Sequence, residues 1–320
     1  MSLHAEQSAQ GGLVDAGPSH VGRPLEHYIV GDPGRAASEV TGPLRRQPGH
    51  PPEIVIDAGA FGRVTVRAAS VRGLSSRFYD KPRQDDYGLG TSSDGEWLVA
   101  VVADGVAAGS LSHLAARSVV RQVPELVRAE LGDRPGDRLE DVDWSGVFGA
   151  AARSIVGLGR RRLGTENEPP TVEEIAKAMS STAVVAVCET GGDGPWRVAL
   201  SWVGDSSAWV LRGDRWEPWS DTSKAQAEVG SSRVVALPAL PSAGVPVRIG
   251  RLEPGDVLVL VSDGLGDPMG EGSGEVSTFL REAWSTPPDP LTFAAQASFA
   301  RKSFDDDRTA VAVWFPGRPG

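Results

Sequence analysis

The sequence predicts an α+β protein in which antiparallel strands dominate. β-Branched and aromatic runs bounded by Gly, Asp and Pro recur along most of the chain. Two of them, Trp196–Val203 and Ser207–Arg212, are separated by only a short turn, which favours antiparallel pairing over a helical crossover. Strands come first, then helices, then a long run of strands. This order indicates α+β layering rather than a doubly wound sheet.

The first 52 residues form a separate region. They contain repeated Pro and Gly and show no sustained period of 2 or 3.6. Such a segment buries too little apolar surface to offset its conformational entropy. We therefore expect a disordered or loosely ordered tail over residues 1–52, without packing against the core and dispensable for catalysis. Residues 53–320 are expected to form one folded domain.

The elements of this domain follow from periodicity and turn residues. The segment Ser112–Leu131 has helical spacing with Pro124 as a kink or break, and Thr171 with Glu174 forms a capping box. The expected helices are Ser112–Leu131, Trp144–Leu163, Glu173–Met179, Gly274–Trp284 and Pro290–Ser303. The expected strands are Arg63–Ser70, Asp86–Leu89, Glu96–Ala103, Ser181–Cys188, Trp196–Val203, Ser207–Arg212, Asp256–Val261 and Thr309–Phe315.

Bulk composition excludes several classes of function. The formal net charge is −10, so a nucleic-acid partner gains no electrostatic support. Apolar runs such as Val257–Val261 are too short to span a bilayer, and no signal peptide pattern opens the chain. Cys188 is the only cysteine, which leaves no internal disulfide and no CxxC motif. A cytoplasmic location without a membrane partner is the expectation.

Acidic residues stand at the ends of several strand candidates. Each of these aspartates alone is an ordinary turn residue. Jointly, carboxylates at neighbouring strand ends would converge on one edge and would need cations to offset their repulsion. The only histidine after residue 52 is His113, so oxygen ligands select Mg²⁺ or Mn²⁺. The positions are Asp85-Asp86, Asp104-Gly105, Asp205, Asp263-Gly264 and Asp305–Asp307.

The order of these segments resembles the metal-dependent serine/threonine protein phosphatases of the PPM group, the type-2C phosphatases. This resemblance implies an αββα sandwich, two antiparallel sheets flanked by helices, over residues 53–320. The matching segments are Arg83-Gln84-Asp85-Asp86, Val102-Ala103-Asp104-Gly105, Ser181-Thr182, Val203-Gly204-Asp205-Ser206-Ser207, Pro254-Gly255-Asp256 through Ser262-Asp263-Gly264-Leu265, and Asp306-Asp307-Arg308-Thr309.

The resemblance also implies a site with two Mn²⁺ or Mg²⁺ ions and a third that is held more weakly. Asp104 resembles the aspartate that bridges two ions, and Gly105 would supply a carbonyl oxygen. Asp263 and Asp306 resemble the other ligands of the pair, Asp85 the residue that holds metal-bound water, and Asp205 a ligand of the third ion. The implied reaction is hydrolysis of phosphoserine or phosphothreonine on proteins by a water that two metals activate. The implied partners are phosphoproteins, the substrates of a Ser/Thr kinase.

The sequence departs from the family in ways that leave alternatives open. The position of the usual phosphate-binding arginine is Asp80, so Arg77 or Arg83 would have to substitute for it. The usual Gly-Gly-His after Asp-Gly is replaced by Val106-Ala107-Ala108. These departures indicate a divergent bacterial branch. They also keep two other functions open: a pseudophosphatase, a metal-binding or regulatory module of the same fold, and a hydrolase of small phosphoesters.

Overall fold

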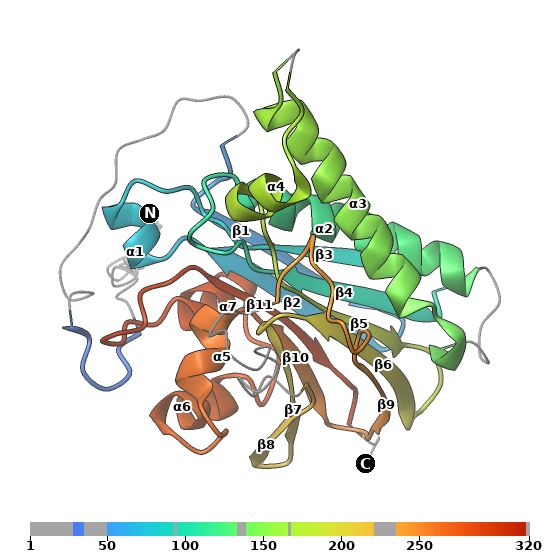
Figure 1. Cartoon of the computed structure of the whole chain (residues 1–320). Helices are drawn as coiled ribbons and strands as arrows, with labels where there is room; N and C mark the ends of the chain where they lie inside the picture. Colours follow the sequence, from blue (N-terminus) through green and yellow to red (C-terminus); the bar gives the residue numbers. More distant parts are fainter. Residues whose placement is uncertain are drawn as a thin grey trace, which may run out of the picture.

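Two antiparallel sheets lie face to face, and helices cover the outer face of each (Figure 1). The computed structural model describes residues 28–34, 50–92, 95–132, 139–165, 168–220 and 235–317. This arrangement is the αββα sandwich, so the predicted fold class is confirmed.

The first sheet contains six strands in the order β1-β2-β11-β10-β7-β8. All neighbours pair antiparallel, for example Leu260 of β10 opposite Val311 of β11. The strands are β1 (Ile54–Phe61), β2 (Val64–Val71), β7 (Ser207–Arg212), β8 (Arg215–Pro218), β10 (Val257–Val261) and β11 (Arg308–Trp314).

The second sheet contains five antiparallel strands in the order β3-β4-β5-β6-β9. Its strands are β3 (Asp86–Thr91), β4 (Trp97–Ala103), β5 (Ala183–Glu189), β6 (Trp196–Val203) and β9 (Val247–Leu252). The helices are α1 (Leu74–Phe78), α2 (Ser112–Leu131), α3 (Trp144–Leu163), α4 (Val172–Ala178), α5 (Asp263–Met269), α6 (Glu275–Ala283) and α7 (Pro290–Ala297), with a short 3₁₀ helix, η2 (Leu139–Asp141).

Alternation of side chains along the strands builds three apolar layers. In β10, Leu258 and Leu260 face the other sheet, whereas Val257, Val259 and Val261 face α5, α6 and α7. In the second sheet the corresponding outer face packs against α2, α3 and α4. Strands β4 and β10 are buried throughout because they have a protein layer on both sides. The first polar residue after each of them therefore comes at the edge of the sandwich.

Some elements differ from the sequence prediction. Strands β1 and β9 were not expected, since most of their residues are exposed and carry no clear alternation. The helix expected over Pro290–Ser303 ends at Ala297, and α2 continues through Pro124 without a break. The capping box of Thr171 and Glu174 is present as predicted.

Part of the expected tail packs against the domain. Residues 28–34 contact the segment that follows α7: Ile29 forms a parallel bridge with Ala300, and Val30 is only 7% exposed. The expectation that residues 1–52 lack packing against the core is therefore wrong for residues 28–34. Their contacts are with residues about 270 positions away, which no local pattern reveals. Residues 1–27 and 35–49 lie outside the described residues.

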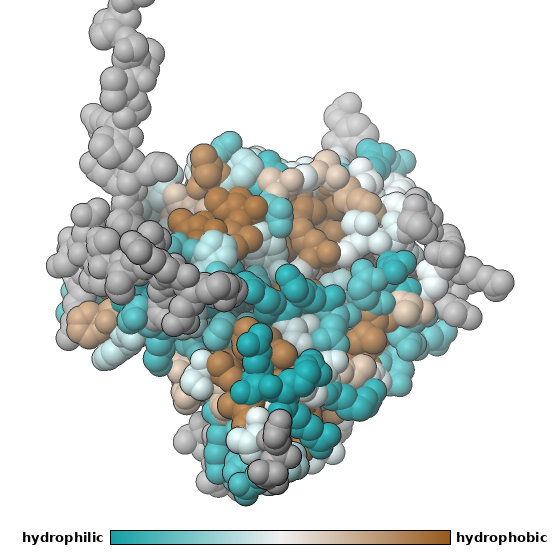
Figure 2. All heavy atoms as spheres, turned by 90° about the horizontal axis from the view of Figure 1, so that it is seen from above, coloured by the Kyte–Doolittle hydropathy of each residue, from teal (hydrophilic) through white to brown (hydrophobic). Residues whose placement is uncertain are grey.

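The surface seen from above is mixed in character. Hydrophilic side chains occupy much of the middle of this face, and hydrophobic side chains form separate areas around them (Figure 2). Among the described residues, no helix has the length and apolar character needed to cross a membrane.

Candidate metal centre

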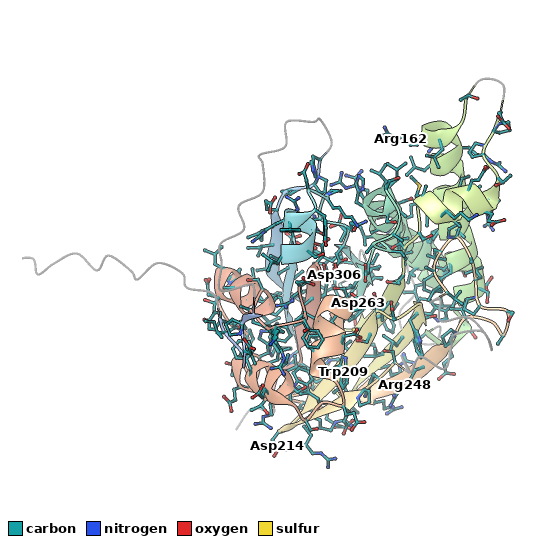
Figure 3. The ribbon with its side chains drawn as sticks, turned by 60° about the vertical axis from the view of Figure 1, so that its left-hand side comes forward. Arg162, Trp209, Asp214, Arg248, Asp263 and Asp306 are labelled. Carbon is teal, nitrogen blue, oxygen red and sulfur yellow. The ribbon has the colours of Figure 1, made fainter. Side chains whose placement is uncertain are left out.

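Five aspartates from both sheets meet at one edge of the sandwich. Asp104 directly follows β4, and Asp263, the first residue of α5, comes two residues after the last residue of β10. Asp205 lies in the turn between β6 and β7. Asp85 precedes β3, and Asp306 precedes β11. Figure 3 shows Asp263 and Asp306 close to each other. We call these five residues, Asp85, Asp104, Asp205, Asp263 and Asp306, the carboxylate cluster.

The glycines after two of these aspartates stand where no side chain fits. A Cβ atom on Gly105 would lie 2.7 Å from the carbonyl oxygen of Gln84. A Cβ atom on Gly264 would lie 2.1 Å from the carbonyl oxygen of Asp307. Both Asp-Gly pairs therefore allow the backbone of another site segment to approach closely. This close approach is the structural reason for a pattern that could otherwise be read as a simple turn.

Three members of the cluster are close enough to share one ion. One carboxylate oxygen from each of Asp104, Asp205 and Asp263 lies within 4.8 Å of the other two. All available donors are oxygen atoms, which suits hard divalent cations such as Mg²⁺ and Mn²⁺. The structure thus brings together the residues that the sequence predicted as ligands of different ions.

Burial and neighbouring carboxylates raise the pKa values of Asp85, Asp104 and Asp263. Burial is the largest cause for Asp85 and Asp104, whose pKa values lie well above the usual range, and neighbouring carboxylates raise them further. Burial, with the charge of Asp306, raises the pKa of Asp263 to about 7. Within the described part of the chain, no basic side chain is among the main influences on these three groups. Carboxylates in this arrangement stabilise an added cation.

Asp85 provides a second sign that a ligand is needed. One of its oxygens is hydrogen-bonded by the hydroxyl of Ser262, whereas Oδ2 is buried and has no hydrogen-bond partner in the described structure. A buried carboxylate oxygen without a partner is costly. A hydrated cation held by the cluster would offer this oxygen a partner. The residues present therefore fit a divalent metal centre.

Asp307 has a different role from its neighbour Asp306. It is buried, and its two oxygens accept hydrogen bonds from the backbone N–H groups of Gly73 (2.6 Å) and Gln84 (2.5 Å). These contacts fix the segments that carry α1 and Asp85. The arrangement favours Asp306 as the metal ligand and Asp307 as the residue that joins the site segments. Sequence reasoning did not identify this bracing role, because both partners are distant backbone groups.

The two arginines considered for phosphate binding are engaged elsewhere. Arg83 is 1% exposed and donates to Ser70, to the carbonyl oxygens of Pro52 and Asp85, and to Asp86. Arg77 on α1 forms an ion pair with Glu53 at 3.2 Å. Neither arginine donates to a side-chain carboxylate of the cluster in these contacts.

Lys81 is the exposed basic residue whose charge acts on the cluster. It lowers the pKa of Asp306, against the larger effect of burial, which raises that pKa. Its Nζ donates to the carbonyl oxygen of Ala107 at 2.9 Å, in the loop that follows Asp104-Gly105. Lys81 thus spans from the end of α1 to the rim of the site. Lys81 lies between Arg77 and Arg83 in the sequence and could have been considered with them. It was passed over because the family uses an arginine to bind phosphate.

Comparisons with known proteins identify the family and the fold. The sequence profile of the family described as protein phosphatase 2C matches residues 72–296. No curated protein matches the chain by sequence. Among solved structures, a bacterial serine phosphatase is similar with a TM-score of 0.54 at 14% identity, covering 80% of this chain and 99% of that one.

Two further structures have the same fold. The serine/threonine phosphatase PstP/Ppp of Mycobacterium tuberculosis gives a TM-score of 0.50 at 19% identity, covering 79% of this chain and 99% of that chain. RsbX in complex with magnesium gives a TM-score of 0.50 at 12% identity, covering 81% and 99%. At these identities the structural likeness concerns the fold, and the family assignment comes from the sequence profile.

Proposed function

The chain belongs to the protein phosphatase 2C family, and from this premise we propose that it hydrolyses phosphoserine and phosphothreonine on proteins with the help of Mn²⁺ or Mg²⁺. The observation that carries the proposal is the carboxylate cluster. Burial and like charges raise the pKa values of Asp85, Asp104 and Asp263, and Oδ2 of Asp85 has no hydrogen-bond partner in the described structure.

Each residue of the site would have a distinct task. Asp104, Asp263 and Asp306 would hold two cations, with the carbonyl oxygen of Gly105 beside them, and Asp205 would contribute to a third. Such cations supply a nucleophilic water at neutral pH and neutralise phosphate oxygens. Asp85, through its unpartnered Oδ2, would accept a hydrogen bond from the attacking water and orient it.

We further propose that Lys81 contacts the phosphate group of the substrate. It is exposed, lies close enough to Asp306 for its charge to act on the pKa of that carboxyl, and is held at the rim by the carbonyl oxygen of Ala107. A lysine would act as a point charge, without the two-pronged contact of an arginine. Lys81→Ala should raise the KM for a phosphothreonine peptide while leaving Mn²⁺ affinity unchanged. Arg77→Ala is the matched control, since Arg77 is paired with Glu53.

The proposed function has a direct test. Hydrolysis of p-nitrophenyl phosphate and of a phosphothreonine peptide would be measured with Mn²⁺ and with EDTA, using Asp104→Asn as the inactive control. We expect metal-dependent turnover of both substrates. Activity that survives complete chelation would exclude the metal mechanism. Turnover of small phosphoesters alone would favour a hydrolase of small molecules.

A second candidate function is a pseudophosphatase. It is favoured by the engagement of Arg77 and Arg83 in other contacts and by the loop Val106-Ala107-Ala108 in place of Gly-Gly-His. In that case the protein would bind Mn²⁺, measured by calorimetry, without turnover of either substrate.

The remaining proposals concern the setting of the reaction. We propose that residues 53–320 form the phosphatase domain, supported by the family match over residues 72–296. The expected substrates are proteins phosphorylated by a Ser/Thr kinase in the cytoplasm. Dephosphorylation of kinase-treated lysate by the wild type, but not by Asp104→Asn, would test this expectation.

A further inference from the structure

A short N-terminal segment pairs with the chain just ahead of the metal ligand Asp306. We call residues 28–34 the N-terminal strap. Val30 N–H donates to the carbonyl oxygen of Ala300 (3.1 Å), and Ala300 N–H donates to that of Tyr28 (2.6 Å). Lys302 N–H donates to the carbonyl oxygen of Asp32 (2.7 Å). These bonds run as in a parallel strand pair, so the strap lies alongside residues 300–302 of the segment 298–304.

Side chains fix the strap in one register. Val30 is buried in the apolar layer beneath α5, α6 and α7. The ring of Tyr28 lies 5.6 Å from that of Phe279 on α6. Gly31 has a φ of +70°, and a Cβ there would lie 2.8 Å from a carboxylate oxygen of Glu275 and 2.9 Å from the guanidinium of Arg301. The positive φ favours glycine at this position, and the ends of the Glu275 and Arg301 side chains lie against it.

The segment 298–304 has no regular structure of its own and depends on contacts from both sides. On its inner side lies Arg308, whose guanidinium stacks 4.0 Å from the ring centre of Phe299. This guanidinium also donates to the carbonyl oxygens of Phe299 and Phe304. On the outer side lies the strap, with Lys302 paired to Asp32 at 3.1 Å. Arg308 and the strap thus enclose the segment 298–304, which ends two residues before Asp306.

We propose that the N-terminal strap is a positioning element for the metal centre, acting through the segment 298–304 on Asp306. The inference rests on the proposed function in one respect, the role of Asp306 as a ligand. Metal ligands must be held to within about 0.5 Å of their productive positions, and supporting contacts set that precision. The strap supplies three backbone hydrogen bonds and one buried side chain to a segment that otherwise has contacts on its inner side.

The test compares two neighbouring residues of the strap in the full-length chain. Val30→Asp would place a charge in the apolar layer and release the strap. Ile29→Asp is the matched control, since the side chain of Ile29 is 60% exposed although its backbone is in the same bridge. Mn²⁺ binding would be measured by calorimetry, and turnover of p-nitrophenyl phosphate would be followed as a function of Mn²⁺ concentration.

We expect Val30→Asp to weaken Mn²⁺ binding by roughly 10-fold, within the range known for residues that support a metal ligand. The kcat at saturating Mn²⁺ should stay close to that of the wild type, because added metal restores the site. Ile29→Asp and the conservative Val30→Ile should bind Mn²⁺ as the wild type does. Unchanged Mn²⁺ affinity in Val30→Asp would overturn the inference.

A second variant covers the case in which Val30→Asp fails to fold. Gly31→Val changes an exposed residue, leaves the apolar layer intact and places a β-branched side chain at a φ of +70°, which strains the strap out of its present backbone conformation. It should weaken Mn²⁺ binding in the same way, and an unchanged affinity would again overturn the inference. A wild type that does not bind Mn²⁺ at all would instead overturn the proposed function. The two failures are therefore distinguishable.

Discussion

The two ends of strand β10 each carry an aspartate, and the protein compensates the two charges in opposite ways. Asp256, at the start, is 3% exposed and accepts hydrogen bonds from Arg212 at 2.8 Å (Nη2) and 3.1 Å (Nε). It also accepts one from the backbone N–H of Glu253. Asp263, just beyond the other end, faces the carboxylates of Asp104 and Asp306, and its pKa is raised to about 7 by burial and by Asp306.

The difference separates a structural carboxylate from a ligand. A guanidinium supplied by the chain makes the charge of Asp256 part of the fold, because the pair is complete without any added component. At Asp263 the chain supplies more negative charge instead of a counterion, which costs stability unless a cation binds. Changes at the Asp256 end should therefore affect folding, and changes at the cluster should affect metal binding and activity.

The largest effect is expected from Asp104→Asn. In the proposed site Asp104 is the ligand that both cations share. Activity with Mn²⁺ should therefore fall by more than about 100-fold, beyond the 10–100-fold typical of residues that only support a ligand. The metal-free protein should melt at a higher temperature than the wild type, because one repelling charge is removed. Activity assays and melting curves in EDTA would check both statements. A variant that loses activity and also melts lower would contradict the assignment of Asp104 to a strained ligand set.

The next effect separates two adjacent aspartates. Asp306→Asn should reduce turnover severely at limiting Mn²⁺, whereas Asp307→Asn should retain the metal dependence. An amide at position 307 would turn a donor toward Gly73 N–H or Gln84 N–H and leave that group unpaired. The expected cost is about 1–3 kcal/mol in the free energy of unfolding. Denaturant titrations and Mn²⁺ titrations of both variants would check this. If the two variants exchanged these effects, Asp307 would be the ligand.

A smaller effect is expected at the other end of β10. Arg212→Ala would leave the buried carboxylate of Asp256 without its guanidinium. The side chain of Arg212 is 39% exposed, so water offsets part of the loss. We therefore expect the free energy of unfolding to fall by about 1–2 kcal/mol, less than for a fully buried pair. Activity per folded molecule and Mn²⁺ affinity should equal those of the wild type. Altered Mn²⁺ affinity would show that the two ends of the strand are coupled.

The sequence was most informative where local pattern and tertiary position coincide. Strands β4 and β10 are buried on both faces, so their apolar runs end abruptly at Asp104 and Ser262-Asp263, and these ends became visible as candidate ligands. Strand β1 was missed because it is a mostly exposed edge strand. Its pattern resembles that of a loop, and only pairing with β2 defines it.

The parts of the site that depend on distant contacts could not be predicted. In the sequence Lys81 is an ordinary surface lysine. Only the folded structure shows that it contacts the loop at Ala107 and that its charge acts on Asp306. The strap is a Gly- and Pro-containing segment whose order comes from Ala300 and Lys302, far along the chain. The helix expected over Pro290–Ser303 stops at Ala297, and the following residues instead surround the guanidinium of Arg308. Lys81 and the strap are fixed by groups remote in sequence, whereas the helix ends early because of a nearby side chain, Arg308.

The last expected effect is a change in the pH dependence of stability when metal is removed. The pKa of Asp263 rises from an unfolded value near 3.8 to about 7 in the folded, metal-free protein. A raised folded pKa means that the folded state binds the extra proton between these two values. Its contribution to stability is present below about pH 4 and is lost as the pH rises through about 7. The metal-free protein should therefore lose stability from this group between pH 4 and 7.

Bound Mn²⁺ should reverse this trend, because it requires the ionised carboxylates and stabilises only the folded state. The difference in melting temperature between samples with Mn²⁺ and with EDTA should widen from pH 5 to pH 8. Asp263→Asn removes the titrating group, so its curve in EDTA should be flatter than that of the wild type. A difference that stays constant with pH would show that Asp263 does not take up a proton on folding of the metal-free protein, and the contrast between a structural and a ligand carboxylate would fail at this strand.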